Sequence, residues 1–163
     1  MLAVRGRGDL IGEMAPLQGQ PRIATATACS ELWVRILTRR QLTDFLETHA
    51  DAALAVTKMV MSRLEWANRR RIDFGAYPAP VRVGRVLAAL AREYGRSGAQ
   101  GWELGVPMTQ LELASLVGVK LSMVEKTLGD LQRKGLVVWG YRKVLVTDMR
   151  RLCEFSGLSS ENP

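Results

Sequence analysis

Residues 109–134 read TQLELASLVGVKLSMVEKTLGDLQRK, and their spacing predicts two short amphipathic helices joined by a tight turn. Thr109 and Glu112 form a capping-box pair at the start of the first helix. The apolar stripe of this helix consists of Leu111, Leu113, Ala114, Leu116 and Val117. Gly118 follows at once and is expected to end the helix, because a left-handed backbone conformation costs glycine little.

The second helix carries apolar residues four and then three positions apart, at Val124, Leu128 and Leu131. This spacing places them on one face, which is expected to pack against the first helix. The residues left facing outward are Ser122, Glu125, Lys126 and Arg133. Two helices of this kind, with a small residue for close approach and a glycine at the corner, form the pattern of a helix-turn-helix.

A β-hairpin is expected directly after the helices, in residues 135–148, GLVVWGYRKVLVTD. Gly135 should end the second helix, and residues 136–139 and 143–146 are two short strand candidates. Gly140, Tyr141 and Arg142 would make the turn between them. A helix-turn-helix followed by a hairpin is a winged helix. Periodicity alone leaves open the alternative of two ordinary packed helices and a hairpin without a nucleic-acid role.

The charge of the chain favours an anionic partner. Its 163 residues carry a formal net charge of +7, with an isoelectric point near 10. No apolar run approaches the length needed to span a membrane, and the first residues, MLAVRGRGD, do not resemble a signal peptide. We therefore expect a cytoplasmic protein that binds nucleic acid. Cys29 and Cys153 stand alone, so the sequence predicts neither a metal site nor a disulfide framework.

The first 37 residues are punctuated by glycine and suggest short strands at residues 2–4, 9–14, 23–28 and 32–37. Four such strands do not close into a unit, and unpaired strand edges invite association. A short helix capped by Thr38 should follow over residues 38–47. Beyond it, helices are expected at residues 81–94 and from the cap Asp148 to about residue 155, with a loop at 95–101 and a strand at 102–106.

A helix of more than twenty residues is expected from about residue 51 to residue 72, followed by a hinge in FGAYPAP, residues 74–80. Its apolar face is wider than one neighbour can cover, which suggests a dimer seam on one side. The seam residues we expect are Leu54, Met61, Leu64 and Asn68. A helix buried entirely within its own subunit is the alternative.

The order of these elements resembles the Crp/Fnr superfamily of cyclic-AMP receptor proteins and fumarate-nitrate regulators. Two motifs carry the resemblance, GDLIGEMAPLQGQPRIATATA at residues 8–28 and TQLELASLVG at residues 109–118. It implies an α+β fold with a partial cyclic-nucleotide-binding β-roll, a long dimerisation helix and a C-terminal winged helix-turn-helix. The corresponding regions are residues 1–48, 49–77 and 78–155, followed by a tail at 156–163. By this resemblance the chain starts inside the sensor domain and lacks the strands that precede the glycine-rich motif.

The resemblance also implies an effector site in the glycine-rich motif. Glu13 would meet a ribose hydroxyl, and Arg22 a cyclic phosphate, with backbone N–H groups near Gly12. Ile23 replaces the small hydroxylic residue that usually follows this arginine. Asn68, preceded by an alanine, stands on the long helix where cyclic-AMP receptors place hydroxyl groups against the adenine. A cyclic nucleotide is therefore the implied effector, but these departures predict weak or no binding of cyclic AMP.

In the second helix of the helix-turn-helix, the positions that meet base edges by resemblance are Leu121, Ser122 and Lys126. Leu121 cannot donate a bidentate pair to guanine but can contact a thymine methyl group, so the DNA target must differ from that of the best-known members. Phosphate contacts are expected from Thr109, Gln110, Lys120, Arg133, Arg142 and Lys143. Ser122 and Glu125 form a second capping-box pair, so a later start of this helix stays open.

These observations predict a sequence-specific regulator of transcription that binds double-stranded DNA as a homodimer, and the resemblance adds RNA polymerase as a further partner. The alternative is an interaction protein that forms heterodimers with a full-length regulator and modulates it. An enzyme is not expected, because no nucleophile, base and orienting group are patterned together.

Overall fold

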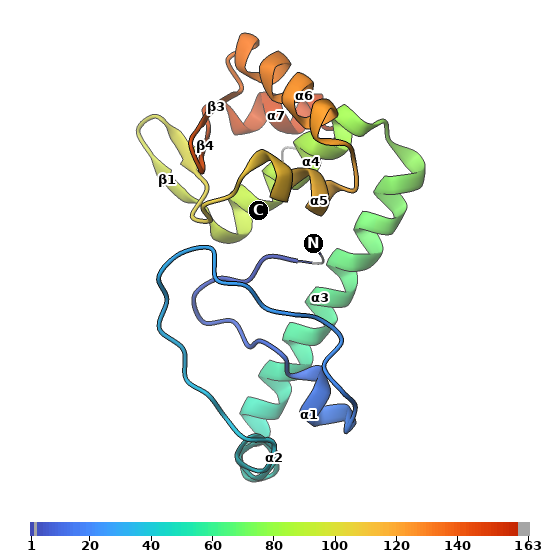
Figure 1. The fold of residues 1–163 in the computed structure, drawn as a ribbon, viewed down its shortest axis with the longest axis vertical. Helices are drawn as coiled ribbons and strands as arrows, with labels where there is room; N and C mark the ends of the chain where they lie inside the picture. The colour runs from blue at the N-terminus through green and yellow to red at the C-terminus, as the bar shows by residue number, and fades with distance from the viewer. Residues whose placement is uncertain (2, 160–163) are drawn as a thin grey trace. The chain divides into compact units, whose positions relative to one another are not determined.

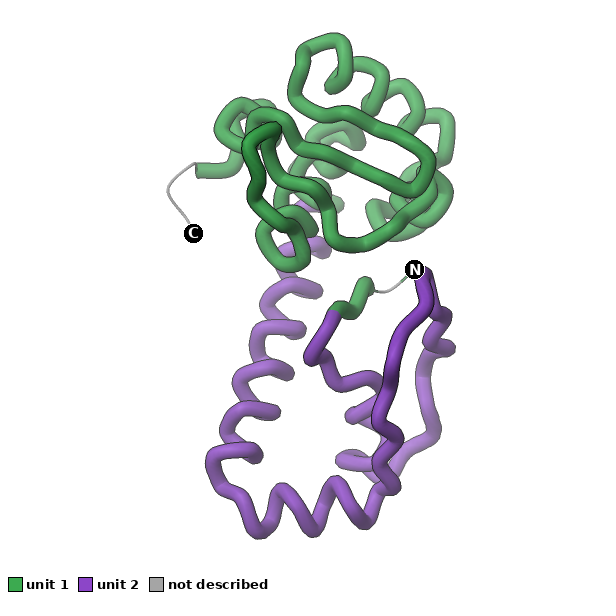
Figure 2. Tube along the Cα trace, turned by 90° about the vertical axis from the view of Figure 1, so that its left-hand side faces the viewer, with its two compact units in different colours: residues 1–6, 74–163 green, residues 7–73 purple. Residues whose placement is uncertain are grey.

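The computed structural model describes residues 1 and 3–159. The chain forms two compact units, one made of residues 7–73 and the other of residues 1–6 and 74–163 (Figure 2). The elements labelled in Figure 1 are α1 (Met14–Gln18), α2 (Arg39–Thr48), α3 (Ala50–Ala76), α4 (Ala79–Tyr94), β1 (Arg96–Gly98), β2 (Gly101–Glu103), α5 (Gln110–Val117), α6 (Leu121–Arg133), β3 (Val137–Gly140), β4 (Lys143–Val146) and α7 (Met149–Phe155).

The unit that contains residues 74–163 combines α4 to α7 with an antiparallel sheet in the order β1-β2-β4-β3. Trp102 of β2 pairs with Val146 of β4, and Val137 of β3 pairs with the same residue from the other side. Helices α5 and α6 pack on each other and on α4, and α7 also packs on α4 (Figure 1). The fully buried side chains of this unit include Val83, Leu87, Leu113, Leu116, Val124, Leu128, Leu131, Val144, Val146 and Leu152.

The helix ends around the turn form as the sequence predicts. The hydroxyl of Thr109 accepts a hydrogen bond from the Glu112 amide at 3.2 Å, and Glu112 Oε2 accepts one from the Thr109 amide at 2.7 Å. Gly118 ends α5 with a φ angle of +73°. Gly135, at φ +66°, follows α6, and its amide donates to the Gln132 carbonyl at 2.9 Å. The predicted caps at Thr38 and Asp148 are also present.

Four predictions about this unit need correction. The expected loop at residues 95–101 contains β1, which pairs with β2, and the expected strand at 102–106 is reduced to β2. Gly140 lies in β3 opposite Lys143, so the hairpin turn consists of two residues, Tyr141 and Arg142. Leu111, assigned to the apolar stripe of the first helix, is 64% exposed, because α5 is packed through Leu113, Leu116 and Val117 instead.

The unit of residues 7–73 is built from α1, α2 and most of α3. The strands predicted at residues 9–14, 23–28 and 32–37 do not form. The last residue of the first segment, Met14, instead begins α1. For the strand at 2–4, residue 2 lies outside the described residues, and residues 3 and 4 pair with no strand. A strand needs a neighbour to satisfy its backbone groups, and the described part of this unit contains no sheet. Among the described residues, no helix combines the length and apolar character needed to cross a membrane.

Candidate nucleic-acid interface

The start of α6 is exposed and carries a positive charge. Lys120 is the N-cap residue, with Leu121 and Ser122 as the first two residues of the helix, and all three side chains are exposed. The helix therefore begins before Ser122, which excludes the later start suggested by the Ser122 and Glu125 pair. No side chain caps this helix end among the described residues. Its first-turn N–H groups carry a positive partial charge, which attracts anions.

The outer face of α6 presents polar side chains along its length. Glu125 and Lys126 are exposed one turn after Leu121 and Ser122, whereas Val124 and Leu128 are buried against the other helices. Arg133, the last residue of α6, is exposed and forms an ion pair with Asp130. A rise of 1.5 Å per residue puts Arg133 about 18 Å along the axis from the start of α6. The base-reading and phosphate-binding residues predicted on α6 thus lie on one exposed face, with Arg133 at its far end.

The start of α5 and the turn of the hairpin are electrostatically linked. The hydroxyl of Thr109, whose side chain is half-buried, is engaged in the capping box and also donates to Glu112 Oε2 at 2.8 Å. The hydrogen bond from the Thr109 backbone lowers the pKa of Glu112, and the positive charge of Arg142 lowers it further. Gln110 is half-buried at the first position of α5, and Lys143 is exposed at the start of β4. The charge of Arg142 on the wing therefore acts on the carboxylate that caps the start of α5.

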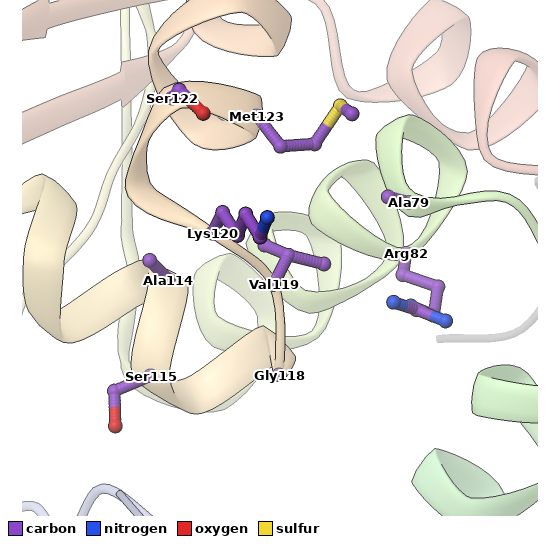
Figure 3. Close-up of a pocket in the computed structure, with 9 residues that line it drawn as sticks. All are labelled: Ala79, Arg82, Ala114, Ser115, Gly118, Val119, Lys120, Ser122 and Met123. Atoms are coloured by element: carbon purple, nitrogen blue, oxygen red, sulfur yellow. The ribbon is translucent and has the colours of Figure 1, made fainter.

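A hollow of about 530 Å³ lies between the start of α4, the end of α5 and the start of α6 (Figure 3). It is lined by Ala79, Arg82, Ala114, Ser115, Gly118, Val119, Lys120, Ser122 and Met123. Of these, only Lys120 and Ser122 were predicted from the sequence to contact DNA. Arg82 precedes the helix-turn-helix by nearly thirty residues, and no motif connects the two, so spacing could not have identified it.

Helix α3 exposes an apolar stripe. Leu54, Met61 and Leu64 are 54%, 58% and 60% exposed, and Asn68 is also exposed. Leu54, Met61 and Asn68 follow one another at intervals of seven residues. Leu64 lies three residues after Met61 and four before Asn68. This is the heptad spacing of a helix that packs against another helix along a seam. The four seam residues predicted from sequence thus share one face of α3.

The glycine-rich motif has an internal ion pair. Glu13 is buried, and its Oε1 accepts a hydrogen bond from Arg63 Nη1 of α3 at 2.5 Å. Arg63 Nη2 also donates to the carbonyl of Leu10 at 2.8 Å and lies 3.3 Å from Asp9 Oδ1. Arg22 is exposed, and its guanidinium approaches Gly12 so closely that a Cβ there would collide with it. The carboxylate predicted to meet a ribose is therefore engaged by an arginine that the sequence reasoning did not consider.

Two family models match this chain. The model of the Crp-like helix-turn-helix domain matches residues 81–155, and that of the cyclic nucleotide-binding domain matches residues 1–49. The first match covers the sheet and helices α4 to α7, including the hairpin and the exposed face of α6.

Relatives and solved structures agree with these matches. The chain is 26% identical over 152 residues to the CRP-like cAMP-activated global transcriptional regulator of Mycobacterium tuberculosis, which covers 93% of this chain and 68% of the relative. It is 29% identical over 160 residues to the transcriptional regulator LdrP of Thermus thermophilus, covering 94% and 75%.

A variant of CooA from Carboxydothermus hydrogenoformans shares the fold, with a TM-score of 0.65, 22% identity and coverage of 72% of this chain and 54% of that one. The chain thus spans about half the length of this solved structure. Since the two domain models and the relatives point to one group, the chain belongs to the Crp/Fnr superfamily of transcriptional regulators.

Proposed function

We propose that this protein regulates transcription by binding double-stranded DNA as a homodimer, with α6 in the major groove and the wing on the backbone. The observation that carries the proposal is the exposed outer side of α6, where Ser122 and Lys126 lie one turn apart and Leu121 is 37% exposed at the start of the helix. A helix of this kind fits the major groove, and its polar side chains can reach base edges. The basic balance of the chain supports the same partner.

The apolar stripe of α3 supports the homodimer. Leu54, Met61 and Leu64 expose more than half of their surface, which is unfavourable for a helix that stays in water. Their spacing with Asn68 suits a parallel pair of helices, in which a polar residue at one seam position fixes the register. Two copies joined in this way would present two α6 helices to successive turns of the duplex.

We propose separately that this chain does not bind a cyclic nucleotide tightly. Arg22 beside Gly12 suits an anion, but Glu13 is engaged by Arg63 and the described residues 23–37 form no sheet that would enclose a nucleotide. The residues present therefore do not fit the group that the family implies. Calorimetric titration with cyclic AMP is expected to give no heat of binding, and a micromolar dissociation constant would contradict this.

A DNA titration at several salt concentrations tests the main proposal. We expect measurable binding of the protein to promoter DNA by mobility shift, with an affinity that falls steeply as salt rises, because counterions are released from the phosphates. A variant that replaces Lys126 with glutamate, on the exposed face of α6, should lose most of this binding. Arg40→Glu offers a matched control, because it makes the same change of charge at a side chain that is 90% exposed on α2. Absence of binding to any duplex at low ionic strength would refute the proposal.

A further inference from the structure

Residues 31–37, ELWVRIL, form an exposed apolar segment that leads into α2. Leu32, Val34 and Ile36 stand at alternate positions and are 50%, 64% and 86% exposed, and Trp33 between them is 97% exposed. The ELWVRIL segment contains no proline, and none of its residues has a positive φ angle. Alternate residues of an extended chain share one face, so as a strand this segment would have a face made only of apolar side chains.

The backbone of the ELWVRIL segment is available for strand pairing. Within the described part of the chain, its N–H and C=O groups form no hydrogen bond with other backbone groups, and the segment belongs to no helix or sheet. An exposed, extended segment with unpaired backbone groups is a template on which another chain can add a strand. The missing element of this segment is therefore a neighbouring strand.

The unit of residues 7–73, all of them described, has little core of its own. Leu42 is the only apolar side chain of this unit that is buried. The whole chain exposes 11265 Å², whereas two separate compact proteins that share its 18.1 kDa would together expose about 9,700 Å². The difference, roughly 1,500 Å² per copy, is about twice the 800 Å² that one partner buries in a stable interface. This excess is enough for a second interface in addition to the α3 seam.

The ELWVRIL segment is complementary to a second copy of itself in one antiparallel register. When the Val34 residues of the two copies lie opposite each other, Leu32 lies opposite Ile36 on both sides of the two-fold axis, so the apolar side chains meet on one face. On the other face Trp33 lies opposite Arg35, whose guanidinium can stack over the indole ring. The register centred on Arg35 would place two arginines opposite each other, and their repulsion disfavours it. A second copy thus satisfies both faces of the strand.

We propose that residues 31–37 of two copies pair as antiparallel strands about a two-fold axis at Val34. Figures 1 and 2 both show the chain that leads into α2 running apart from α3, so this contact lies outside the α3 seam and joins one proposed dimer to another. The pairing itself requires neither DNA nor the seam. A ribbon of two short strands is marginal in water, so the contact is weaker than the seam and forms mainly at high local concentration.

Disulfide trapping in the full chain tests the register. In a Cys29→Ser background, which removes the half-buried native thiol, Val34→Cys should give a covalent dimer on mild oxidation, because opposite Cα atoms of an antiparallel pair lie about 4.5–5.5 Å apart. Trp33→Cys and Arg35→Cys are matched controls. Each would lie roughly 8 Å from its own counterpart, beyond the reach of a disulfide, and should give little product alone. Mixed with each other, these two variants should cross-link.

The pattern of products on a non-reducing gel decides the outcome. A maximum at position 34, together with a product from the mixed controls, supports the proposed pair. Equal cross-linking at positions 33, 34 and 35 would indicate random collision between exposed segments and would overturn the proposal. A maximum at position 33 or 35, or no product at any of the three, would overturn it as well.

Sedimentation velocity at high protein concentration tests the contact without added cysteines. Wild type should form species larger than the α3 dimer. Val34→Lys should raise the dissociation constant of this step at least roughly tenfold, because two lysines would face each other across the axis. Ile23→Lys makes a matched change at a side chain that is 74% exposed in the same unit but outside the segment, and it should behave as wild type.

The same measurement separates a failure of this pairing from a failure of the α3 seam. If wild type passes only from monomer to dimer, and Val34→Lys abolishes that dimer while Leu64→Asp does not, the seam fails and the strand pairing stands. Equal dissociation constants for wild type, Val34→Lys and Ile23→Lys would overturn the strand pairing and leave the seam and DNA binding untouched.

Discussion

Replacing Leu64 with alanine should weaken the dimer without unfolding the subunit. The Leu64 side chain is 60% exposed in the single chain, so that fraction is available for burial against a second copy. Complete burial of a leucine is worth about 1.5–3 kcal/mol, which gives roughly 1.4 kcal/mol for this fraction and about twice that for two copies. The dissociation constant of the dimer should therefore rise about a hundredfold. Leu64→Asp should go further and yield monomers, because it would bury an unpaired charge.

Sedimentation velocity over a dilution series measures this change directly. Leu111→Ala is a matched control, since Leu111 is 64% exposed on α5 and lies outside the proposed seam. It should leave the dissociation constant unchanged. An unchanged dimer in the Leu64→Asp variant, or an equal effect of Leu64→Ala and Leu111→Ala, would place the interface elsewhere and refute the reasoning.

Three further predictions concern the DNA-binding unit. If Lys126 reads guanine, Lys126→Ala should reduce discrimination between DNA sequences by roughly 1–3 kcal/mol. Lys143→Ala should instead weaken binding to all sequences alike. Competition binding with variant duplexes separates these effects. Gly118→Ala should lower the free energy of unfolding by about 1–2 kcal/mol, because the φ angle of Gly118 is +73°. The added Cβ would lie at an ordinary 3.8 Å from the nearest atom of Phe74, so the cost comes from the backbone and not from a collision. Chemical denaturation measures this change, and an unchanged midpoint would contradict the strain argument. The lowered pKa of Glu112 contributes stability above its unfolded value of about 4.3, which is lost as pH falls through the folded value; the stability difference between wild type and Glu112→Gln should therefore shrink in acid.

The helix-turn-helix could be derived from sequence because its signals are local. Thr109 and Glu112 define one helix start, and Gly118 and Gly135 define two helix ends, each within a few residues of the structure that it produces. Apolar spacing also identified the buried face of α6 correctly, from Val124 to Leu131. Such features need no knowledge of the rest of the fold.

Features that depend on distant partners could not be derived in this way. Residues 23–28 and 32–37 have the composition of strands, yet strand formation depends on a neighbour that the local sequence does not specify. Leu111 fits a helical stripe, but only the placement of α4 and α6 determines which side of α5 is covered. Arg82 and Arg63 escaped notice for the same reason, because each meets its partners through the fold and not through a motif.

The hairpin turn combines a backbone cost with a positive charge. Arg142 adopts a φ angle of +54°, a conformation that glycine would accept more easily by about 1 kcal/mol. Arg142→Gly should therefore give a protein that melts at a higher temperature but carries one charge less at the tip of the wing. If the wing touches the backbone of a duplex, the same change would lower the affinity of the protein for DNA. The melting temperature would then rise while the occupancy of the operator falls.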